Sequence, residues 1–245
     1  MRKRFFLLWF GIFIGAVLLI ATVMTKIYST HLANVPEISF SSAEKVDIEE
    51  QIAEEEWCLI LVNKEHCIPN DYEVELVELS NGQCVDRRIY PALQEMFDTA
   101  RSEGIYPVVA SGYRTVEKQQ SLMDEKIAAY LVEGYSLREA KEKAEIWVAA
   151  VGTSEHQLGI SVDINADGVH SAGSEVYKWL DENSYQFGFI KRYPEDKTEI
   201  TGIINEPWHY RYVGKAAAAE IYRSGVCLEE YLEELGQSNS IESDM

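Results

Sequence analysis

The chain has 245 residues, and its 22 basic and 41 acidic side chains give a formal net charge of −19 at pH 7. This excess of negative charge excludes nucleic acid as a partner, because the phosphate backbone binds basic surfaces. Once the N-terminal segment is set aside, the length suits one compact domain of about 180 residues with a buried core.

The N-terminus has the pattern of a membrane anchor. The run Phe5–Thr25 contains no charged side chain and follows Arg2, Lys3 and Arg4. As a helix it would measure about 32 Å, enough to cross a bilayer core of about 30 Å. The basic residues before it keep residues 1–4 in the cytoplasm by the positive-inside rule, so we expect a single-pass cell-membrane protein whose remainder is extracytoplasmic. A cleaved signal peptide is the alternative, although this run is longer than the usual apolar region and no small-x-small site follows it.

A spacer separates this anchor from the rest of the chain. Residues 26–56 begin polar and end in the acidic run Glu49–Glu56, a composition typical of a solvated stalk. We therefore predict a single domain at residues 57–236, followed by a polar tail at residues 237–245.

The four cysteines are Cys58, Cys67, Cys84 and Cys227. None forms a C-x-x-C pair, so a thiolate zinc site is not expected. Export permits a disulfide such as Cys67–Cys84, and the sequence leaves this pairing and free buried thiols both open.

Helical and extended patterns alternate through the predicted domain. Apolar residues at helical spacing, short β-branched runs, a capping box and helix-ending glycines mark the elements. In chain order we expect a helix around 93–100, a strand at 106–110, a helix at 116–133, a helix from Ser136 and Glu139 to about 152, a strand at 159–164, a helix at 174–187, a strand at 208–213 and a helix at 215–224. This order fits an α+β or an α/β fold.

Two segments carry groups that bind metals. Residues 154–163 read SEHQLGISVD, and residues 206–214 read EPWHYRYVG. Together they supply two imidazoles, His156 and His209, the carboxylate of Asp163, and a spare carboxylate, Glu206. A catalytic zinc site typically has three protein ligands of N/O type and one open position, and a further group acts as the base. The two segments therefore predict a zinc hydrolase.

These motifs resemble the metal site of zinc D,D-carboxypeptidases of the VanY type, which trim the last D-alanine from peptidoglycan stem peptides. The similarity extends to SGYR at residues 111–114 and RYPEDKT at residues 192–198, and it covers roughly residues 57–236. It implies an α+β fold in which helices pack on a small, mostly antiparallel sheet. It also implies one zinc ion per chain, held by His156, Asp163 and His209.

The resemblance makes Glu206 the base that takes a proton from the attacking water. Pro207 excludes a regular helix interior here, and the H-E-x-x-H pattern of other zinc peptidases is absent. The alternative role for Glu206 is a carboxylate that orients a histidine ligand.

Arg114 follows the strand at 106–110. A fixed guanidinium there suits the developing oxyanion or the terminal carboxylate of the substrate, and a surface salt bridge is the alternative. Tyr113, Gln119 and Ser154 match family positions near the substrate. Trp208 is expected in a pocket wall or in the core.

The resemblance thus implies a zinc metallo-carboxypeptidase, not a serine-type enzyme, acting on peptidoglycan stem pentapeptides or their precursors. Removing the terminal D-alanine also removes what vancomycin-like glycopeptides bind, so a resistance role is consistent with the chemistry. The nearest rival is an L,D-carboxypeptidase acting on tetrapeptide stems. Two other functions remain open. One is an endopeptidase that cuts cross-links, and the other is an inactive zinc-stabilised module that binds the cell wall.

Overall fold

The computed structural model describes residues 56–243, with the side chains of residues 56–236. All of these residues belong to one compact unit, Ile48–Met245. The predicted anchor and nearly all of the predicted stalk lie outside the described residues, so both remain predictions. Within residues 56–243, no helix combines the length and the apolar character needed to cross a membrane.

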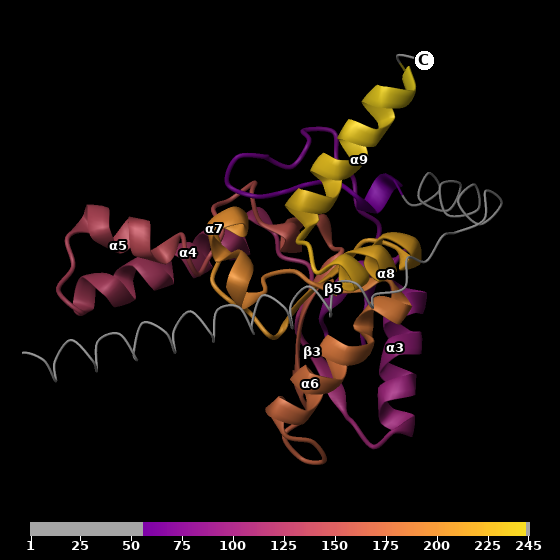
Figure 1. Cartoon of the computed structure of the whole chain (residues 1–245). Helices are drawn as coiled ribbons and strands as arrows, with labels where there is room; N and C mark the ends of the chain where they lie inside the picture. Colours follow the sequence, from indigo (N-terminus) through magenta and orange to yellow (C-terminus); the bar gives the residue numbers. More distant parts are fainter. Residues whose placement is uncertain (1–55, 244–245) are drawn as a thin grey trace, which may run out of the picture. The chain divides into compact units, whose positions relative to one another are not determined.

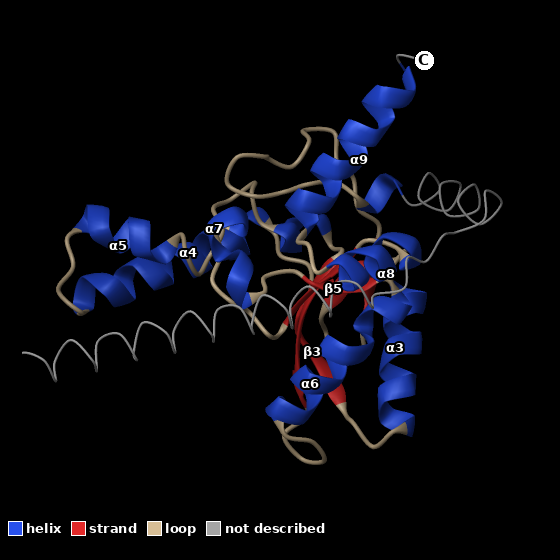
Figure 2. Ribbon diagram, in the orientation of Figure 1, coloured by secondary structure: helices blue, strands red, loops and turns tan. Residues whose placement is uncertain are grey.

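The main sheet has four strands, in the order β3-β4-β6-β5, and every neighbouring pair is antiparallel. Figure 2 shows it at the centre of the described fold. The strands are β3 (Pro107–Ser111), β4 (Ser161–Ala166), β5 (Phe189–Lys191) and β6 (His209–Tyr212). A separate antiparallel hairpin joins β1 (Leu76–Glu78) to β2 (Cys84–Asp86). The small antiparallel sheets confirm the α+β class and exclude the α/β alternative.

Helices surround the sheet, and α4 and α5 extend to one side of it (Figure 1). Their bounds are α3 Tyr90–Ser102, α4 Val116–Val132, α5 Leu137–Ala144, α6 Gly173–Asn183, α7 Thr198–Thr201, α8 Lys215–Ser224 and α9 Leu228–Ser243. Four short 3-10 turns complete the described elements: η1 Glu56–Cys58, η2 Glu155–Leu158, η3 Ser184–Phe187 and η4 Glu195–Lys197.

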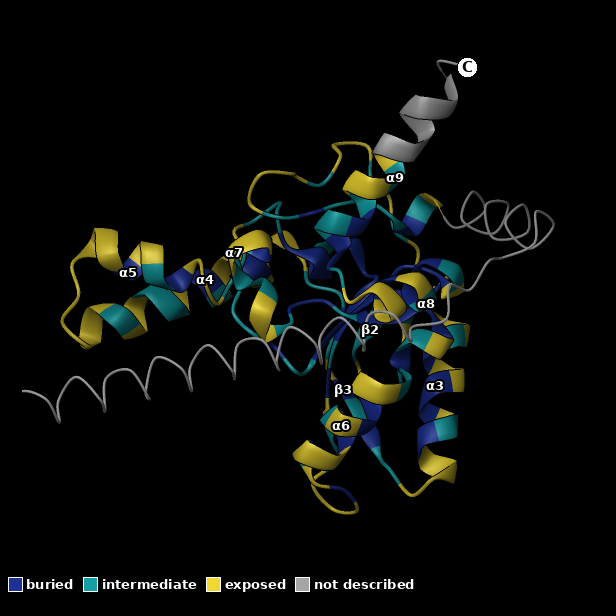
Figure 3. Cartoon of the chain, viewed as in Figure 1, coloured by how far each residue is buried: buried dark blue, intermediate teal, exposed yellow. Residues whose placement is uncertain are grey.

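The two faces of the sheet differ in chemistry, because successive strand residues point to opposite faces. Val162 and Ile164 of β4 and Tyr210 and Tyr212 of β6 join the core that includes buried residues of α3 and α6. The residues between them belong to the opposite face, where register pairs Ser161 with Arg211 and Asp163 with His209. Of these residues, Ser161, His209 and Arg211 are buried and Asp163 is partly exposed, and Figure 3 shows buried residues in dark blue at the centre of the described fold. Such a face needs partners for its charges, and it is where the metal-binding motifs meet.

A second apolar cluster lies beyond this polar face. Ile190 of β5 packs there with the buried side of α8 and with Leu228 and Tyr231 of α9. The C-terminal helix α9 is thereby fixed against the sheet, and residues 237–243 of the predicted tail continue that helix.

The structure contains most of the predicted elements. It differs from the prediction in where two helices end and in three short strands that were not predicted. The second helix of the α4–α5 pair ends at Ala144, well before 152. The following segment is non-helical, and Gln119 Nε2 donates to the carbonyl oxygen of Ala149 there at 2.6 Å. The helix predicted to reach 187 ends at Asn183 and continues as the 3-10 turn η3, which Gly188 stops at φ 84°. Strands β1, β2 and β5 have three residues each and are too short to show a period.

All four cysteines lie among the described residues, and no disulfide joins any two of them. Cys58 and Cys227 are buried, whereas Cys67 is exposed. The structure therefore favours free thiols over the Cys67–Cys84 disulfide.

Candidate metal centre

The predicted ligands converge although they come from three elements. His156 lies on η2, Asp163 on β4, and His209 begins β6 directly opposite Asp163 in the strand register. Each offers a ligand atom, and these atoms all lie within 4.8 Å of one another. Both histidines are about 3% exposed, so the cluster lies in a sheltered, low-dielectric site.

The three side chains are close enough together to bind one zinc ion. His156 Nε2 lies 3.3 Å from Asp163 Oδ2, and His209 Nδ1 lies 3.2 Å from Asp163 Oδ1, so the two histidines approach different oxygens of the one carboxylate. A set of two imidazoles and one carboxylate also leaves one position open, as in catalytic zinc sites. The residues present therefore fit the metal that their sequence predicts.

A glycine allows the His156 loop to join the Asp163 strand. Gly159 ends η2 in the left-handed region at φ 76°, a conformation that favours glycine. A Cβ there would lie 3.1 Å from Val74 Cγ2 and 3.2 Å from the Asp86 nitrogen, so space is limited as well. The turn reverses the chain between the two ligands.

Each histidine is held through the nitrogen that does not face the cluster. His156 Nδ1 lies 2.8 Å from the Gly112 carbonyl oxygen, to which it donates, and this leaves Nε2 for the metal. His209 Nε2 lies 3.3 Å from Glu155 Oε2, and this leaves Nδ1 facing Asp163. Such partners set the ring orientation and the tautomer of a metal ligand. Glu155 and the Gly112 carbonyl are thus part of the site.

Glu155 is the centre of a buried ionic network. Its Oε1 lies 2.7 Å from Arg192 Nε and 3.0 Å from Arg211 Nη1, although the latter contact lacks hydrogen-bond geometry. Burial acts to raise the pKa of Glu155, but the attraction of Arg192 and Arg211 outweighs it and holds that pKa well below the ordinary value. Glu155 is therefore a permanent anion behind His209.

The network continues to the C-terminal helix. Arg192 donates Nη1 to Glu229 Oε2 at 2.8 Å and Nη2 to Glu229 Oε1 at 2.6 Å, a bidentate pair with α9. Arg211 donates Nη2 to the carbonyls of Cys58 and Ile60, which fixes the start of the domain. The ligand His209 is thereby connected to both ends of the described chain.

The spare carboxylate lies beside the cluster and outside it. Glu206 Oε2 is 3.8 Å from His209 Nδ1, and Glu206 is not among the three residues whose ligand atoms cluster. Burial raises the pKa of Glu206 to about 7; Asp163 also raises it, while His209 and Arg114 act in the opposite direction. A carboxyl group with this pKa can both accept and return a proton near neutral pH.

Arg114 faces the metal ligands and is not a surface residue. It donates Nη2 to Asp163 Oδ2 at 2.6 Å and Nε to Ser111 Oγ at 2.9 Å. Burial lowers its pKa, and Asp163 and Glu206 partly restore it. The alternative role of Arg114, a salt bridge at the surface, is therefore wrong. Arg114 does form an ion pair with Asp163, but its side chain is only 18% exposed. One nitrogen, Nη1, remains for a further anion.

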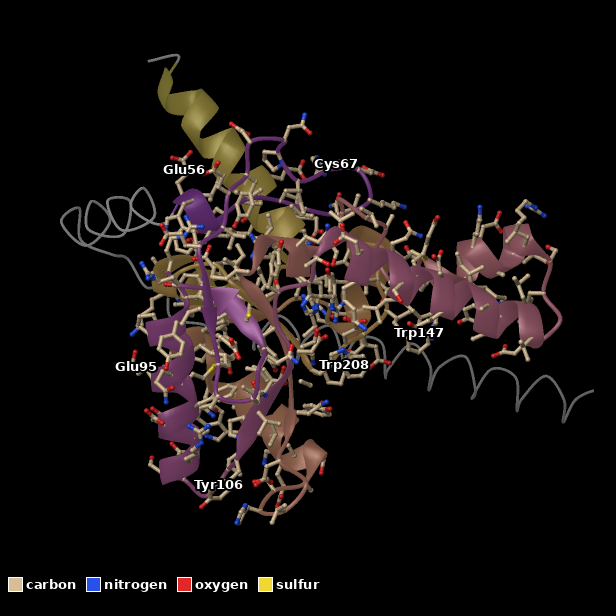
Figure 4. The ribbon with its side chains drawn as sticks, turned by 180° about the vertical axis from the view of Figure 1, so that it is seen from behind. Glu56, Cys67, Glu95, Tyr106, Trp147 and Trp208 are labelled. Atoms are coloured by element: carbon tan, nitrogen blue, oxygen red, sulfur yellow. The ribbon has the colours of Figure 1, made fainter. Side chains whose placement is uncertain are left out.

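A cavity of about 240 Å³ opens onto these groups. Its lining contains the three ligands with Glu155, Glu206, Arg114, Ser154, Tyr193, Ile203 and Trp208, and on the α4–α5 side Leu122, Lys126, Trp147, Val148 and Ala149. Figure 4 labels two of these lining residues, Trp147 and Trp208. The expected position of Trp208 in a pocket wall is confirmed.

The three residues predicted to contact the substrate, Tyr113, Gln119 and Ser154, do not all line the cavity. Ser154 lines the cavity, whereas Tyr113 and Gln119 are not among its lining residues. Gln119 is fully buried, where its Nε2 binds Ala149 and its Oε1 has no hydrogen-bond partner among the described groups. Its observed contact is structural, so a substrate role for Gln119 and Tyr113 stays a prediction.

Sequence reasoning missed Glu155, Glu229 and Lys126. A signal existed for the first, because Glu155 lies within the SEHQLGISVD motif and its partner Arg192 begins RYPEDKT. Charged residues inside two separate motifs are candidates for a buried pair. Glu229 and Lys126 belong to no motif.

An α+β fold with an N/O metal triad, and a non-ligand carboxylate beside it, defines a metallohydrolase of the zinc peptidase class. Residues 82–215 match the family model described as VanY, D-alanyl-D-alanine carboxypeptidase, and the chain belongs to this family. It is 60% identical over 214 residues to a D-alanyl-D-alanine carboxypeptidase of Enterococcus faecalis strain ATCC 700802 / V583, covering 86% of this chain and 80% of that protein.

Solved structures agree with this assignment. A vancomycin resistance D,D-pentapeptidase VanY variant in complex with Zn(II) is 67% identical, with a TM-score of 0.71, covering 72% of this chain and 99% of that one. VanYB in complex with D-alanine-D-alanine is also 67% identical, with a TM-score of 0.72, covering 72% and 98%. The LD-carboxypeptidase LdcB is more distant, at 36% identity and a TM-score of 0.60, covering 71% and 84%.

Proposed function

We propose that this protein is a zinc-dependent D,D-carboxypeptidase that removes the C-terminal D-alanine from peptidoglycan stem pentapeptides. The observation that carries the proposal is the placement of Glu206: its carboxylate lies 3.8 Å from the ligand nitrogen of His209, outside the metal cluster, with its pKa raised to about 7. The family membership and the relatives with Zn(II) and with D-alanine-D-alanine support the same reading.

Zinc, when bound, supplies a Lewis acid at the scissile carbonyl and lowers the pKa of water. His156, Asp163 and His209 would hold it, and Gly112 and Glu155 fix the two imidazoles. Because Glu155 is a buried anion, it also makes His209 a stronger electron donor.

Glu206 takes the proton of the attacking water and delivers it to the nitrogen of the departing D-alanine. One group can serve both steps because its pKa lies near neutrality and burial keeps bulk water from competing. Water adds to the carbonyl carbon, the C–N bond breaks, and a shortened peptide and D-alanine leave.

Arg114 has two roles in this scheme. Its Nη2 contact with Asp163 fixes a ligand, and its remaining Nη1 can face negative charge on the substrate. A buried guanidinium is well suited to a developing oxyanion, because a low dielectric strengthens the attraction. The intact Glu206 and Arg114 argue against an inactive wall-binding module.

The experiment that tests the function is a comparison of substrates. The domain is incubated with pentapeptide and with tetrapeptide stems, and products are identified by mass. The proposal expects release of one D-alanine from the pentapeptide and little cleavage of the tetrapeptide. Faster cleavage of the tetrapeptide would replace the D,D assignment by the L,D alternative.

We also propose that the run Phe5–Thr25 anchors the enzyme in the cell membrane with the catalytic domain outside. The support is the sequence alone: an uncharged run after Arg2, Lys3 and Arg4. Protease added to spheroplasts should digest the domain. Protection would mean an inverted topology, and recovery of a soluble secreted form would mean that the segment is cleaved.

A further inference from the structure

The cavity has a second basic side chain, on α4. Lys126 lines the cavity together with Leu122, four residues earlier on the same helix face. Arg114 and Lys126 are its lysine and arginine residues. Arg192 and Arg211 are fully buried behind Glu155 and do not line the cavity.

Arg114 and Lys126 differ in the side chains that they already contact. Arg114 gives Nη2 to Asp163 and Nε to Ser111. Lys126 is in no ion pair or hydrogen bond with any of the described side chains of residues 56–236. Its Nζ lies 4.3 Å from the centroid of the Trp147 ring and 5.6 Å from that of Tyr130. The ammonium is thus held in place by aromatic rings while its charge remains without a carboxylate partner.

The Trp147 contact restricts a side chain that is ordinarily mobile. A lysine ammonium within about 6 Å of an indole face is attracted by the ring, and this reduces its freedom while leaving N–H donors for an anion. Trp147 lies on the segment after α5 and Lys126 on α4, so the contact spans the rim of the cavity. The position of the charge is therefore set by two elements.

Most other charges at the cavity already have partners. Glu155 pairs with Arg192 and Arg211, and Asp163 pairs with Arg114 and belongs to the metal cluster. A peptide cut by a carboxypeptidase ends in a free carboxylate, and a stem peptide carries another on its γ-linked glutamyl residue. Lys126 is the cavity-lining cation that has no carboxylate partner among the described residues, so it can bind such a group.

We propose that Lys126, held on Trp147, is a substrate-binding residue that takes a carboxylate of the stem peptide. This inference rests on the proposed function and deepens it: the cavity selects stem peptides by their negative charge as well as by their terminal D-alanine. The shared chemistry is a carboxylate, either the C-terminal one or that of the upstream glutamyl residue.

The test measures binding without turnover. Zinc-loaded Glu206→Ala protein is titrated calorimetrically with a pentapeptide that has both carboxylates, and again after Lys126→Met or Lys126→Arg is added. A charge-assisted contact at a half-exposed side chain predicts a Kd about tenfold weaker for Lys126→Met. Lys126→Arg should recover most of the affinity.

The matched control is Lys143→Met. Lys143 is also half-buried and has its Nζ 4.5 Å from a tyrosine ring, that of Tyr135, but it does not line the cavity. This variant should leave the Kd unchanged. Equal weakening by the two methionine variants would overturn the proposal, as would no weakening by Lys126→Met.

Two modified peptides identify the carboxylate. One has the upstream carboxylate amidated and the other has the C-terminus amidated. If Lys126 binds the carboxylate that a peptide lacks, Lys126→Met should not change the Kd of that peptide. The same substitution should still weaken the Kd of the other peptide about tenfold. An equal loss with both peptides would mean that Lys126 only shapes the pocket, and the proposal fails. Failure of the proposed function would show separately, as absence of D-alanine release by the wild-type enzyme.

Discussion

Neutralising Glu155 tests whether the buried network supports the metal ligand. In Glu155→Gln the shape is kept, but Arg192 and Arg211 lose the carboxylate that lies 2.7 and 3.0 Å from them. Breaking a buried pair by removing one partner costs about 3–5 kcal/mol. For a domain of this size, each kcal/mol lowers the Tm by about 2–4 °C, so a fall of roughly 6–20 °C is expected.

A second readout separates ligand positioning from general stability. Glu155 Oε2 accepts from His209 Nε2 at 3.3 Å, and losing such a partner typically weakens metal binding about 10–100-fold. The assay is a thermal scan of metal-free and zinc-loaded protein, together with zinc affinity by competition with a chelator.

The control is Glu182→Gln, an exposed carboxylate 3.9 Å from Lys178 Nζ, whose loss should cost less than about 1 kcal/mol. A Tm for Glu155→Gln within about 2 °C of the wild type, with unchanged zinc affinity, would refute the reasoning.

Three further predictions follow from the same geometry. Arg114→Ala should lower kcat/KM at least about tenfold, since a charge-assisted contact is worth about 1.5–3 kcal/mol; activity within twofold would contradict this, and zinc content is the control. The kcat/KM should fall as the pH drops through the pKa of Glu206, at or below about 7 because a bound cation lowers it; a flat profile from pH 8 to 5 would exclude Glu206 as the base. Because the folded-state pKa of Glu155 is depressed, its stabilisation is present above the unfolded value of about 4.3 and lost as the pH falls toward the folded value; the stabilities of wild type and Glu155→Gln should therefore converge in acid.

The ligand set could be predicted from the sequence because two short motifs supply metal-binding groups and resemble those of VanY-type enzymes. The residue types indicated a zinc hydrolase, and the resemblance assigned His156, Asp163 and His209 as ligands. The role of Glu206 as the base also came from the resemblance. The structure adds that Asp163 and His209 are register partners, which no spacing in the sequence reveals.

The supporting residues could not be predicted by the same means. The contacts of Glu155 with Arg192 and of Arg192 with Glu229 each span 37 residues, and the second depends on how α9 packs. Charged side chains are usually exposed, so the burial of Arg192, which is only 1% exposed, follows from tertiary packing that the sequence does not show. Strand β5 was missed because three residues show no period.

The central claim is that three residues hold zinc while a fourth performs proton transfer. One measurement tests it most directly: zinc content and D-alanine release determined on the same sample of Glu206→Ala, beside wild type and the His156→Ala/His209→Ala double variant. The account predicts one zinc per chain in Glu206→Ala, with turnover lowered about 10²–10⁴-fold, and loss of zinc from the double variant. Glu206→Ala activity within tenfold of wild type, or full zinc in the double variant, would contradict it.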